Sequence, residues 1–137
     1  MRVSVIVPTY NEADNIVEVI DRLRRALSDQ SHEIIVVDDD SPDGTWQVAR
    51  HHGAGDPVVR VIRRIGERGL ASAVLDGMAA AEGDALAVMD GDLQHDESVL
   101  PEMVRSVLDG GADVCVGSRI GESGSFGDRA RLRHWLT

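Results

Sequence analysis

The residues with the clearest chemical potential form the run Asp90-Gly91-Asp92-Leu93-Gln94-His95, which directly follows an apolar segment at Ala85 to Met89. Side chains alternate along an extended segment, so Asp90, Asp92 and Gln94 can point to one side. Carboxylate and amide oxygens are hard ligands that suit Mg²⁺ or Mn²⁺ better than structural Zn²⁺. The run therefore predicts a divalent-metal site with positions left for substrate phosphates. The alternative is a solvated acidic turn that caps the following helix.

A second acidic segment, Asp38-Asp39-Asp40, follows another apolar run and leads into Ser41-Pro42-Asp43-Gly44. Three adjacent carboxylates repel one another unless a cation, hydroxyl or amide partner is near. A ribose diol or a base N–H group is such a partner, so we expect Asp38 and Asp39 to face a ligand. Ser41 and Asp43 fit the chemistry of a turn and are expected to be structural.

Two shorter segments complete the candidate residues. Tyr10 can stack on a base. Asn11 is a possible N-cap of the following helix, and Glu12 would lie at the positive end of that helix. A purely capping role for the Glu12 carboxylate is as open as a ligand-binding role. Arg119, after the last apolar run, is either a phosphate partner or a surface arginine. Five other arginines are expected to be mostly solvated or helix-face charges, with one or two of them binding substrate: Arg64, Arg68, Arg129, Arg131 and Arg133.

Five apolar runs alternate with segments of helical spacing, and each candidate segment follows one of these runs. Near-continuous apolar strands alternating with helices predict an α/β fold with a doubly wound, mostly parallel sheet covered by helices on both faces. Ligands bind at the carboxyl ends of the strands in such sheets. The expected strands are 3–7, 33–37, 58–62, 85–89 and 114–116, and the expected helices are 12–27, 45–52, 70–81 and 98–108.

Length and composition exclude several classes of protein. The chain has 137 residues, which predicts a single domain over 1–137, and its formal charge of −10 disfavours broad nucleic-acid binding. All 14 cationic residues are arginines, which excludes a lysine Schiff base and a Walker lysine. One cysteine, Cys115, excludes an internal disulfide framework and is expected to be an inert core residue. Without a signal peptide or a long apolar span, a cytoplasmic location is expected.

The sequence resembles the family 2 glycosyltransferases of the GT-A fold, and most closely the dolichol- or polyprenol-phosphate mannose synthases. The broad family is indicated by Pro8-Thr9-Tyr10-Asn11-Glu12 and by the DxD run Asp90-Gly91-Asp92. The narrower branch is indicated by Ser41-Pro42-Asp43-Gly44-Thr45 and Asp92-Leu93-Gln94-His95. Two further matching blocks are Gly69-Leu70-Ala71-Ser72-Ala73 with Gly77, and Gly117-Ser118-Arg119.

The resemblance implies a Rossmann-like nucleotide-sugar-binding domain with GDP-mannose as donor, a polyprenyl phosphate as acceptor and Mg²⁺ or Mn²⁺ as cofactor. It implies Asp92 and Gln94 as metal ligands, and Asp90, Asp92, Arg119 and Arg133 as catalytic residues, with Arg131 an alternative to Arg133. The implied contacts to the nucleotide sugar are Pro8, Tyr10, Glu12, Val37, Asp39, Asp90, Gly91 and Asp92. Gly91 stands where the family often has Ala, and a common family Lys is absent near Arg68.

The resemblance also implies an inverting transfer at the cytoplasmic face of the membrane, with peripheral association through the lipid acceptor. Members usually run further, so we expect the chain to lack a C-terminal acceptor-side part. Three alternatives stay open from sequence: a UDP-sugar-dependent transferase of the same fold, a non-catalytic nucleotide-sugar-binding fragment, and a doubly wound domain whose acidic pocket binds Mg²⁺ alone.

Overall fold

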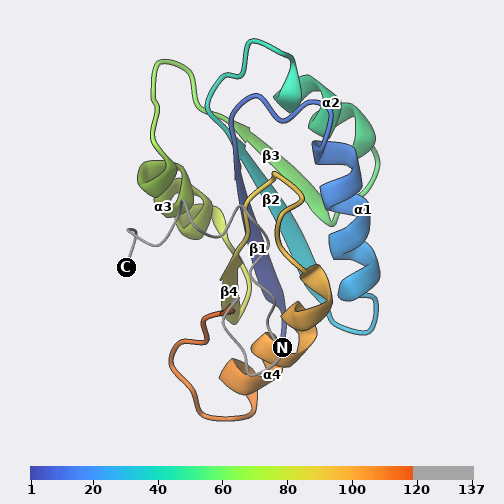
Figure 1. Cartoon of the computed structure of the whole chain (residues 1–137), viewed down its shortest axis with the longest axis vertical. Coiled ribbons are helices and arrows are strands. Elements are labelled where there is room, and N and C mark those ends of the chain that lie inside the picture. Colours follow the sequence, from blue (N-terminus) through green and yellow to red (C-terminus); the bar gives the residue numbers. More distant parts are fainter. Residues whose placement is uncertain (119–137) are drawn as a thin grey trace.

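A computed structural model describes residues 1–118 and contains one sheet of four parallel strands (Figure 1). The strands are β1 (Val3–Thr9), β2 (His32–Asp38), β3 (Val59–Arg63) and β4 (Ala85–Val88), in the spatial order β3-β2-β1-β4. β1 and β2 lie in the centre, and their apolar residues have no exposed surface. A central strand buried on both faces explains why the sequence runs there are continuously apolar.

The helices are α1 (Ile16–Ala26), α2 (Thr45–His52), α3 (Leu70–Ala80) and α4 (Leu100–Leu108), the last preceded by a short 3₁₀ turn, η1 (Glu97–Val99). The helical spacing in α1 places Ile16, Val19, Ile20 and Leu23 on its buried face. No helix in the part of the chain described here is long and apolar enough to cross a membrane.

Helices cover both faces of the sheet, which confirms the predicted doubly wound architecture (Figure 1). On one face, α1, α2 and α4 pack on a core that includes Val5, Val7 and Ile34. On the other face, α3 packs through Ala73 against Ile6, Ile35 and Val37. The alternation of side chains along each strand divides the apolar residues between these two cores.

α3 approaches the sheet closely at Gly77. A Cβ atom built on Gly77 would lie 2.5 Å from Cγ2 of Ile6 and 3.1 Å from Cγ2 of Val37. Any side chain at this position would push the helix away from the sheet. Gly77 therefore sets the distance of α3, and α3 begins directly after the segment that borders the candidate site.

A buried carboxylate ties the strands together at the end of the sheet away from the candidate site. Glu33 has no exposed surface, and its carboxylate accepts hydrogen bonds from Ser4 Oγ (2.6 Å), the Glu82 N–H (2.8 Å) and Arg60 Nη1 (2.9 Å). Arg2 Nη2 lies 3.6 Å away. Burial alone would raise the pKa of the Glu33 carboxyl, but these partners outweigh burial and hold its pKa below the ordinary value.

Four predictions of local structure are wrong. Residues 114–116 form no strand: Val114 and Val116 are 76% and 80% exposed, and Cys115 is half-buried rather than a core residue. A short apolar run has strand propensity, but pairing with a neighbour decides whether it becomes a strand. α1 begins at Ile16 and not at Glu12, and Asn11 is not its cap.

The late start of α1 has a long-range cause. The N–H of Asn11 donates to Ser41 Oγ (3.0 Å), and the N–H of Glu12 donates to Thr45 Oγ1 (2.9 Å). Asn11 also has a left-handed backbone, with φ of 57°. The loop after β2 and the first residue of α2 thus hold residues 11 and 12 outside the helix, a constraint that helical spacing within 12–27 does not contain.

Candidate functional site

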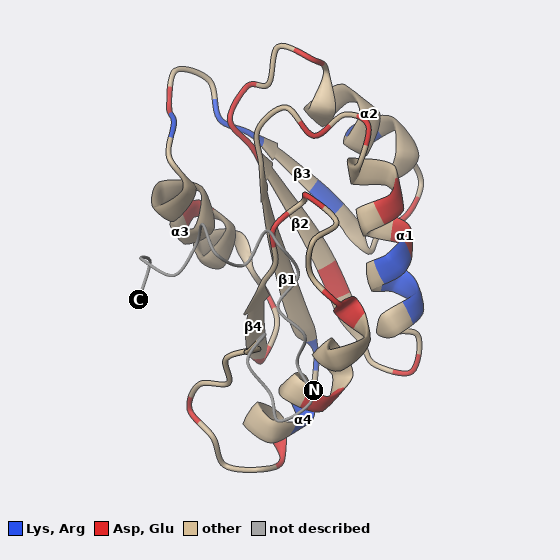
Figure 2. Cartoon of the chain, viewed as in Figure 1, with Lys and Arg blue, Asp and Glu red and all other residues tan. Residues whose placement is uncertain are grey.

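The candidate residues meet because the central strands end level with one another. Thr9 of β1 is opposite Asp38 of β2, and Asp38 is opposite Arg63 of β3. The pairing continues past the strands, since the Asp39 N–H donates to the Thr9 carbonyl (3.1 Å). Figure 2 shows acidic residues on the loops that follow β2 and β4 and basic residues on the segment after β3.

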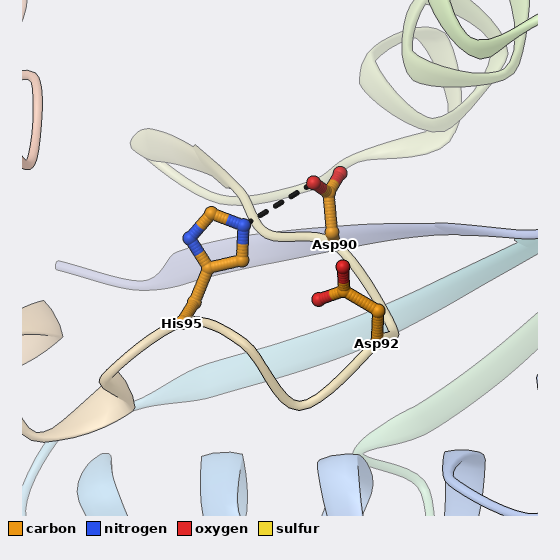
Figure 3. Close-up of side chains that lie close together, drawn as sticks. All are labelled: Asp90, Asp92 and His95. Carbon is orange, nitrogen blue, oxygen red and sulfur yellow. Dashed lines mark hydrogen bonds and ion pairs between the residues drawn. The ribbon is translucent and has the colours of Figure 1, made fainter. Parts of the chain in front are cut away.

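The loop after β4 gathers three possible metal ligands. Asp90, Asp92 and His95 each offer one ligand atom, and these atoms all lie within 4.8 Å of one another. In Figure 3 the two carboxylates and the imidazole come from the same loop and point toward one another. His95 Nε2 lies 3.2 Å from Asp90 Oδ2, so the imidazole can orient that carboxylate.

The chemistry of this donor set fits a hard divalent cation. Two carboxylates that converge on one point repel each other unless a positive charge lies between them. Carboxylate oxygens suit Mg²⁺ and Mn²⁺, and a small number of protein ligands leaves positions for phosphate oxygens. Gln94 is exposed, and its N–H donates to Asp92 Oδ1 (3.0 Å). The role of its side-chain amide as a ligand stays a prediction.

Gly91 brings this loop against the end of β1. A Cβ atom on Gly91 would lie 3.1 Å from Thr9 Cγ2 and 3.7 Å from Glu12 Cγ. The carboxylates on either side of Gly91 are thereby held beside the segment that carries Tyr10 and Glu12. The close approach agrees with the glycine that the sequence places between the two aspartates.

Asp38 does not face a ligand, contrary to the prediction. It has no exposed surface, and Thr9 Oγ1 and Ser41 Oγ donate to its Oδ1 (2.8 and 2.7 Å). The Ser41 N–H donates to its Oδ2 (2.8 Å). Asp38 therefore joins the ends of β1 and β2, because Thr9 and Ser41 supply the hydrogen-bond donors that a ligand was expected to supply.

Ser41 and Asp43 have the structural roles that the sequence predicts. Asp43 accepts hydrogen bonds from the Thr45 N–H (3.0 Å), Thr45 Oγ1 (2.6 Å) and the Ala13 N–H (3.0 Å). Burial alone would raise the pKa of Asp43, but these hydrogen bonds outweigh it and hold the pKa below its usual value. Asp43 thus joins the start of α2 to the segment after β1.

Asp39 is held by the segment after β3. Its Oδ1 accepts from Arg64 Nη1 (2.6 Å), and its Oδ2 accepts from the Gly69 N–H (2.8 Å). Asp39 also lines an open pocket together with Asp40, Gly66, Glu67 and Arg68. The carboxylate therefore has a fixed orientation at the border of a pocket.

Tyr10 packs against Arg68, one of the residues that line this pocket, with Arg68 Cζ 4.5 Å from the centre of the tyrosine ring. The tyrosine is 41% exposed. Guanidinium groups stack on aromatic faces, and bases stack there as well. One face of Tyr10 is thus suited to a planar ligand that would take the place of Arg68.

The other predicted contacts to the nucleotide differ in accessibility. Glu12 is half-buried, and its Oε2 accepts from Asn15 Nδ2 (2.8 Å). Pro8 is buried in β1. Val37 has no exposed surface and packs with Ile6, so a nucleotide reaches it only if covering residues move. Arg119, Arg131 and Arg133 lie outside the described residues, and their predicted roles stay predictions.

Arg64 is the residue that sequence reasoning missed. It was expected to be a solvated charge, but its side chain is only 3% exposed and ion-paired with Asp39, Glu67 and Asp76. Burial would lower its pKa, but the hydrogen bond with Glu67 and the charges of Asp39 and Asp76 raise it above the ordinary value. Its place directly after a strand is the signal that could have separated it from surface arginines.

Comparison with known proteins agrees with this geometry. The sequence model described as Glycosyl transferase family 2 matches residues 4–137. The chain belongs to this family. Among curated relatives, the dolichol-phosphate mannosyltransferase of Pyrococcus furiosus is 48% identical over 124 residues, which are 90% of this chain and 35% of the relative. The chain thus spans about a third of the length of this glycosyltransferase.

Solved glycosyltransferase structures share the fold. A mannosyltransferase from Pyrobaculum calidifontis, in complex with GDP-Man and Mn²⁺, superposes with a TM-score of 0.67 at 32% identity, over 78% of this chain and 32% of that one. A glucosyl-3-phosphoglycerate synthase from Mycobacterium tuberculosis, in complex with Mn²⁺, UDP and phosphoglyceric acid, superposes with a TM-score of 0.65 at 28% identity. The match covers 78% of this chain and 39% of that one. The family 2 domain of this chain therefore has the GT-A architecture expected from sequence, and both neighbours hold Mn²⁺.

Proposed function

We propose that this family 2 domain transfers mannose from GDP-mannose to a polyprenyl phosphate, with a divalent cation held by the loop after β4. The observation that carries the proposal is the convergence of Asp90, Asp92 and His95 within 4.8 Å at the end of β4, beside the segment after β1. The 48% identity to a dolichol-phosphate mannosyltransferase supports the sugar and the acceptor class. The complex with GDP-Man and Mn²⁺ supports the donor and the metal.

Charge explains how such a site would work. A phosphate acceptor is already anionic at neutral pH, so it needs no general base to become a nucleophile. The departing nucleoside diphosphate is the group that needs stabilisation. A divalent cation, when bound, supplies positive charge opposite that diphosphate. Asp92, with Gln94 and Asp90, would hold the cation, and Arg119 would add a cationic partner for a phosphate.

The remaining residues would bind and orient the donor. Tyr10 offers a ring face for the base, and Asp39 offers a charged acceptor for N–H or hydroxyl donors of the nucleoside. Asp90, oriented by His95, would lie next to the sugar. A single in-line displacement at the α-linked sugar would give a β-linked product. A lipid acceptor would bring the domain to the cytoplasmic face of a membrane.

The proposal is tested by binding and by transfer. Isothermal titration should give tighter binding of GDP-mannose than of UDP-glucose, each with Mn²⁺, followed by mannose transfer to a short-chain polyprenyl phosphate. Tighter UDP-glucose binding would favour a UDP-sugar transferase, which the UDP complex of the Mycobacterium tuberculosis relative makes the second candidate. Donor binding without transfer would indicate a nucleotide-sugar-binding fragment.

A further inference from the structure

Arg64 connects three parts of the candidate site with one buried guanidinium. Nη1 donates to Asp39 Oδ1 (2.6 Å) and to the Gly69 carbonyl (3.3 Å), while Nη2 donates to Glu67 Oε2 (3.0 Å) and Ser72 Oγ (2.7 Å). Nε lies 2.8 Å from Asp76 Oδ2. Its contacts thus span the loop after β2, the segment 64–69 and the first turns of α3.

Backbone hydrogen bonds also connect the loop after β2 to the segment 64–69. The Arg64 N–H donates to the Asp38 carbonyl (2.8 Å), which extends the β2–β3 pairing to the residue before Asp39. The Gly69 N–H reaches Asp39 Oδ2 (2.8 Å). Gly69 has φ of 131°, a conformation that favours glycine. Both oxygens of Asp39 are therefore fixed by the two ends of the segment 64–69.

This arrangement leaves Asp39 able to accept from a ligand as well. A carboxylate offers about four acceptor positions, and the two partners at Arg64 and Gly69 use one position on each oxygen. The same segment carries Arg68, whose guanidinium covers the ring of Tyr10. The Arg64 side chain thus contacts both the Asp39 carboxylate, which can accept hydrogen bonds from a ligand, and the segment 64–69, which carries Arg68 to the ring of Tyr10.

We infer that Arg64 is a positioning residue for the nucleotide base: it aims the Asp39 carboxylate and sets the 64–69 segment against the pocket. The guanidinium touches no reacting atom and acts through Asp39. A planar fork with several donors is needed, because lysine is a single point charge on a flexible stem and cannot serve Asp39, Glu67 and Ser72 together. The inference rests on the proposed function, since it requires a nucleotide in this pocket.

The test separates the base from the rest of the ligand. Isothermal titration of the full chain with Mn²⁺ compares GDP with ribose 5-diphosphate, which lacks only the base, and the ratio of the two affinities measures what the base contributes. In Arg64→Lys this ratio should fall about tenfold, the scale of one charge-assisted hydrogen bond, while ribose 5-diphosphate binds as in the wild type. A merely structural role would weaken both ligands equally, and that result would overturn the inference.

The matched control is Arg60→Lys, the same substitution within β3, four residues before Arg64. Arg60 serves the buried carboxylate of Glu33 at the other end of the sheet (2.9 Å), so its variant should melt at a lower temperature with an unchanged affinity ratio. If Arg64→Lys does not fold, Ser72→Ala replaces it, because Ser72 Oγ accepts from Arg64 and donates to the Gly69 carbonyl (3.0 Å). A drop of about threefold in the ratio is expected, and an unchanged ratio would overturn the inference.

The outcome also distinguishes the inference from the proposed function. If the wild type binds neither GDP nor UDP, the proposed function is wrong and the role of Arg64 falls with it. If the wild type binds a nucleotide and Arg64→Lys keeps the full contribution of the base, only the positioning role is wrong.

Discussion

The guanidinium of Arg68 lies over the ring of Tyr10, with 4.5 Å between Arg68 Cζ and the centre of the ring. The two residues come from different loops, one after β1 and one after β3. Their contact joins these two loops by a cation on an aromatic face, next to the pocket that Arg68 lines. A base that stacks on Tyr10 must replace Arg68 there, so the ring and not the hydroxyl should determine affinity.

This relationship gives a prediction for Tyr10. Tyr10→Phe keeps the ring and should bind GDP within about twofold of the wild type, whereas Tyr10→Leu should lose about tenfold, the scale of one base–aromatic stack. Isothermal titration with Mn²⁺ measures both. Equal GDP affinities for the Phe and Leu variants would show that the base does not stack on the ring of Tyr10.

Asp39 and Asp43 should differ in what their loss affects. Asp39→Asn weakens an acceptor at the pocket and should reduce GDP affinity about tenfold. Asp43→Ala removes the hydrogen bonds from Thr45 and Ala13 and should cost about 1–2 kcal/mol of stability, the net scale of one or two hydrogen bonds, with little change in GDP affinity. Melting curves and titration on both variants check the division, and the reverse pattern would contradict it.

Gly77 predicts a packing defect that a second substitution relieves. Gly77→Ala places a methyl group against Ile6 and should cost about 1–3 kcal/mol of unfolding free energy. In an Ile6→Ala background the same substitution should cost less than half as much, because the nearest clashing atoms, those of Ile6, are gone and only Val37 Cγ2 remains within 3.1 Å. Urea unfolding of the four proteins gives the coupling. Additive costs would show that Gly77 does not set the distance of α3.

Glu33 predicts a specific pH dependence of stability. Its pKa is lower in the folded chain than the ordinary value of 4.5, so its ionised form stabilises the fold above that value, and this contribution is lost as pH falls through the folded pKa. Glu33→Gln should cost about 2 kcal/mol at pH 7, and the cost should shrink as the wild type is acidified. Urea unfolding between pH 7 and pH 3 measures it. A cost that is constant with pH would contradict the role assigned to the charge.

The sheet and its helices were predictable because their signal is local. Continuous apolar runs mark β1 and β2, and helical spacing marks the buried face of α1. The rule that ligands bind at the carboxyl ends of strands then predicts that the loops after these strands lie together, and the structure places them in contact. The convergence of Asp90 and Asp92 in the loop after β4 also follows from residue types alone, since the two residues lie close in sequence as well as in space.

The errors come from contacts between distant residues. Asp38 and Asp39 are adjacent and chemically identical. The carboxylate of Asp38 accepts hydrogen bonds from Thr9 and Ser41 inside the fold. The carboxylate of Asp39 is instead oriented at the pocket by Arg64 and Gly69. Nothing in the acidic run distinguishes them. The burial of Arg64 likewise depends on partners from two other segments, which composition and spacing do not reveal.

In the proposed function, the loop after β4 binds a divalent cation on which donor binding depends. Isothermal titration of GDP-mannose with and without Mn²⁺ tests it on the wild type, Asp92→Ala and the control Asp96→Asn. Asp96 is on the same loop but accepts from the Ser98 N–H (3.0 Å) at the start of η1, so its variant should bind as the wild type does. We expect Mn²⁺ to strengthen donor binding in the wild type and Asp92→Ala to lose this gain, a drop of at least about tenfold, while its melting temperature is kept. Unchanged Mn²⁺-dependent affinity in Asp92→Ala would show that this loop does not hold the cation.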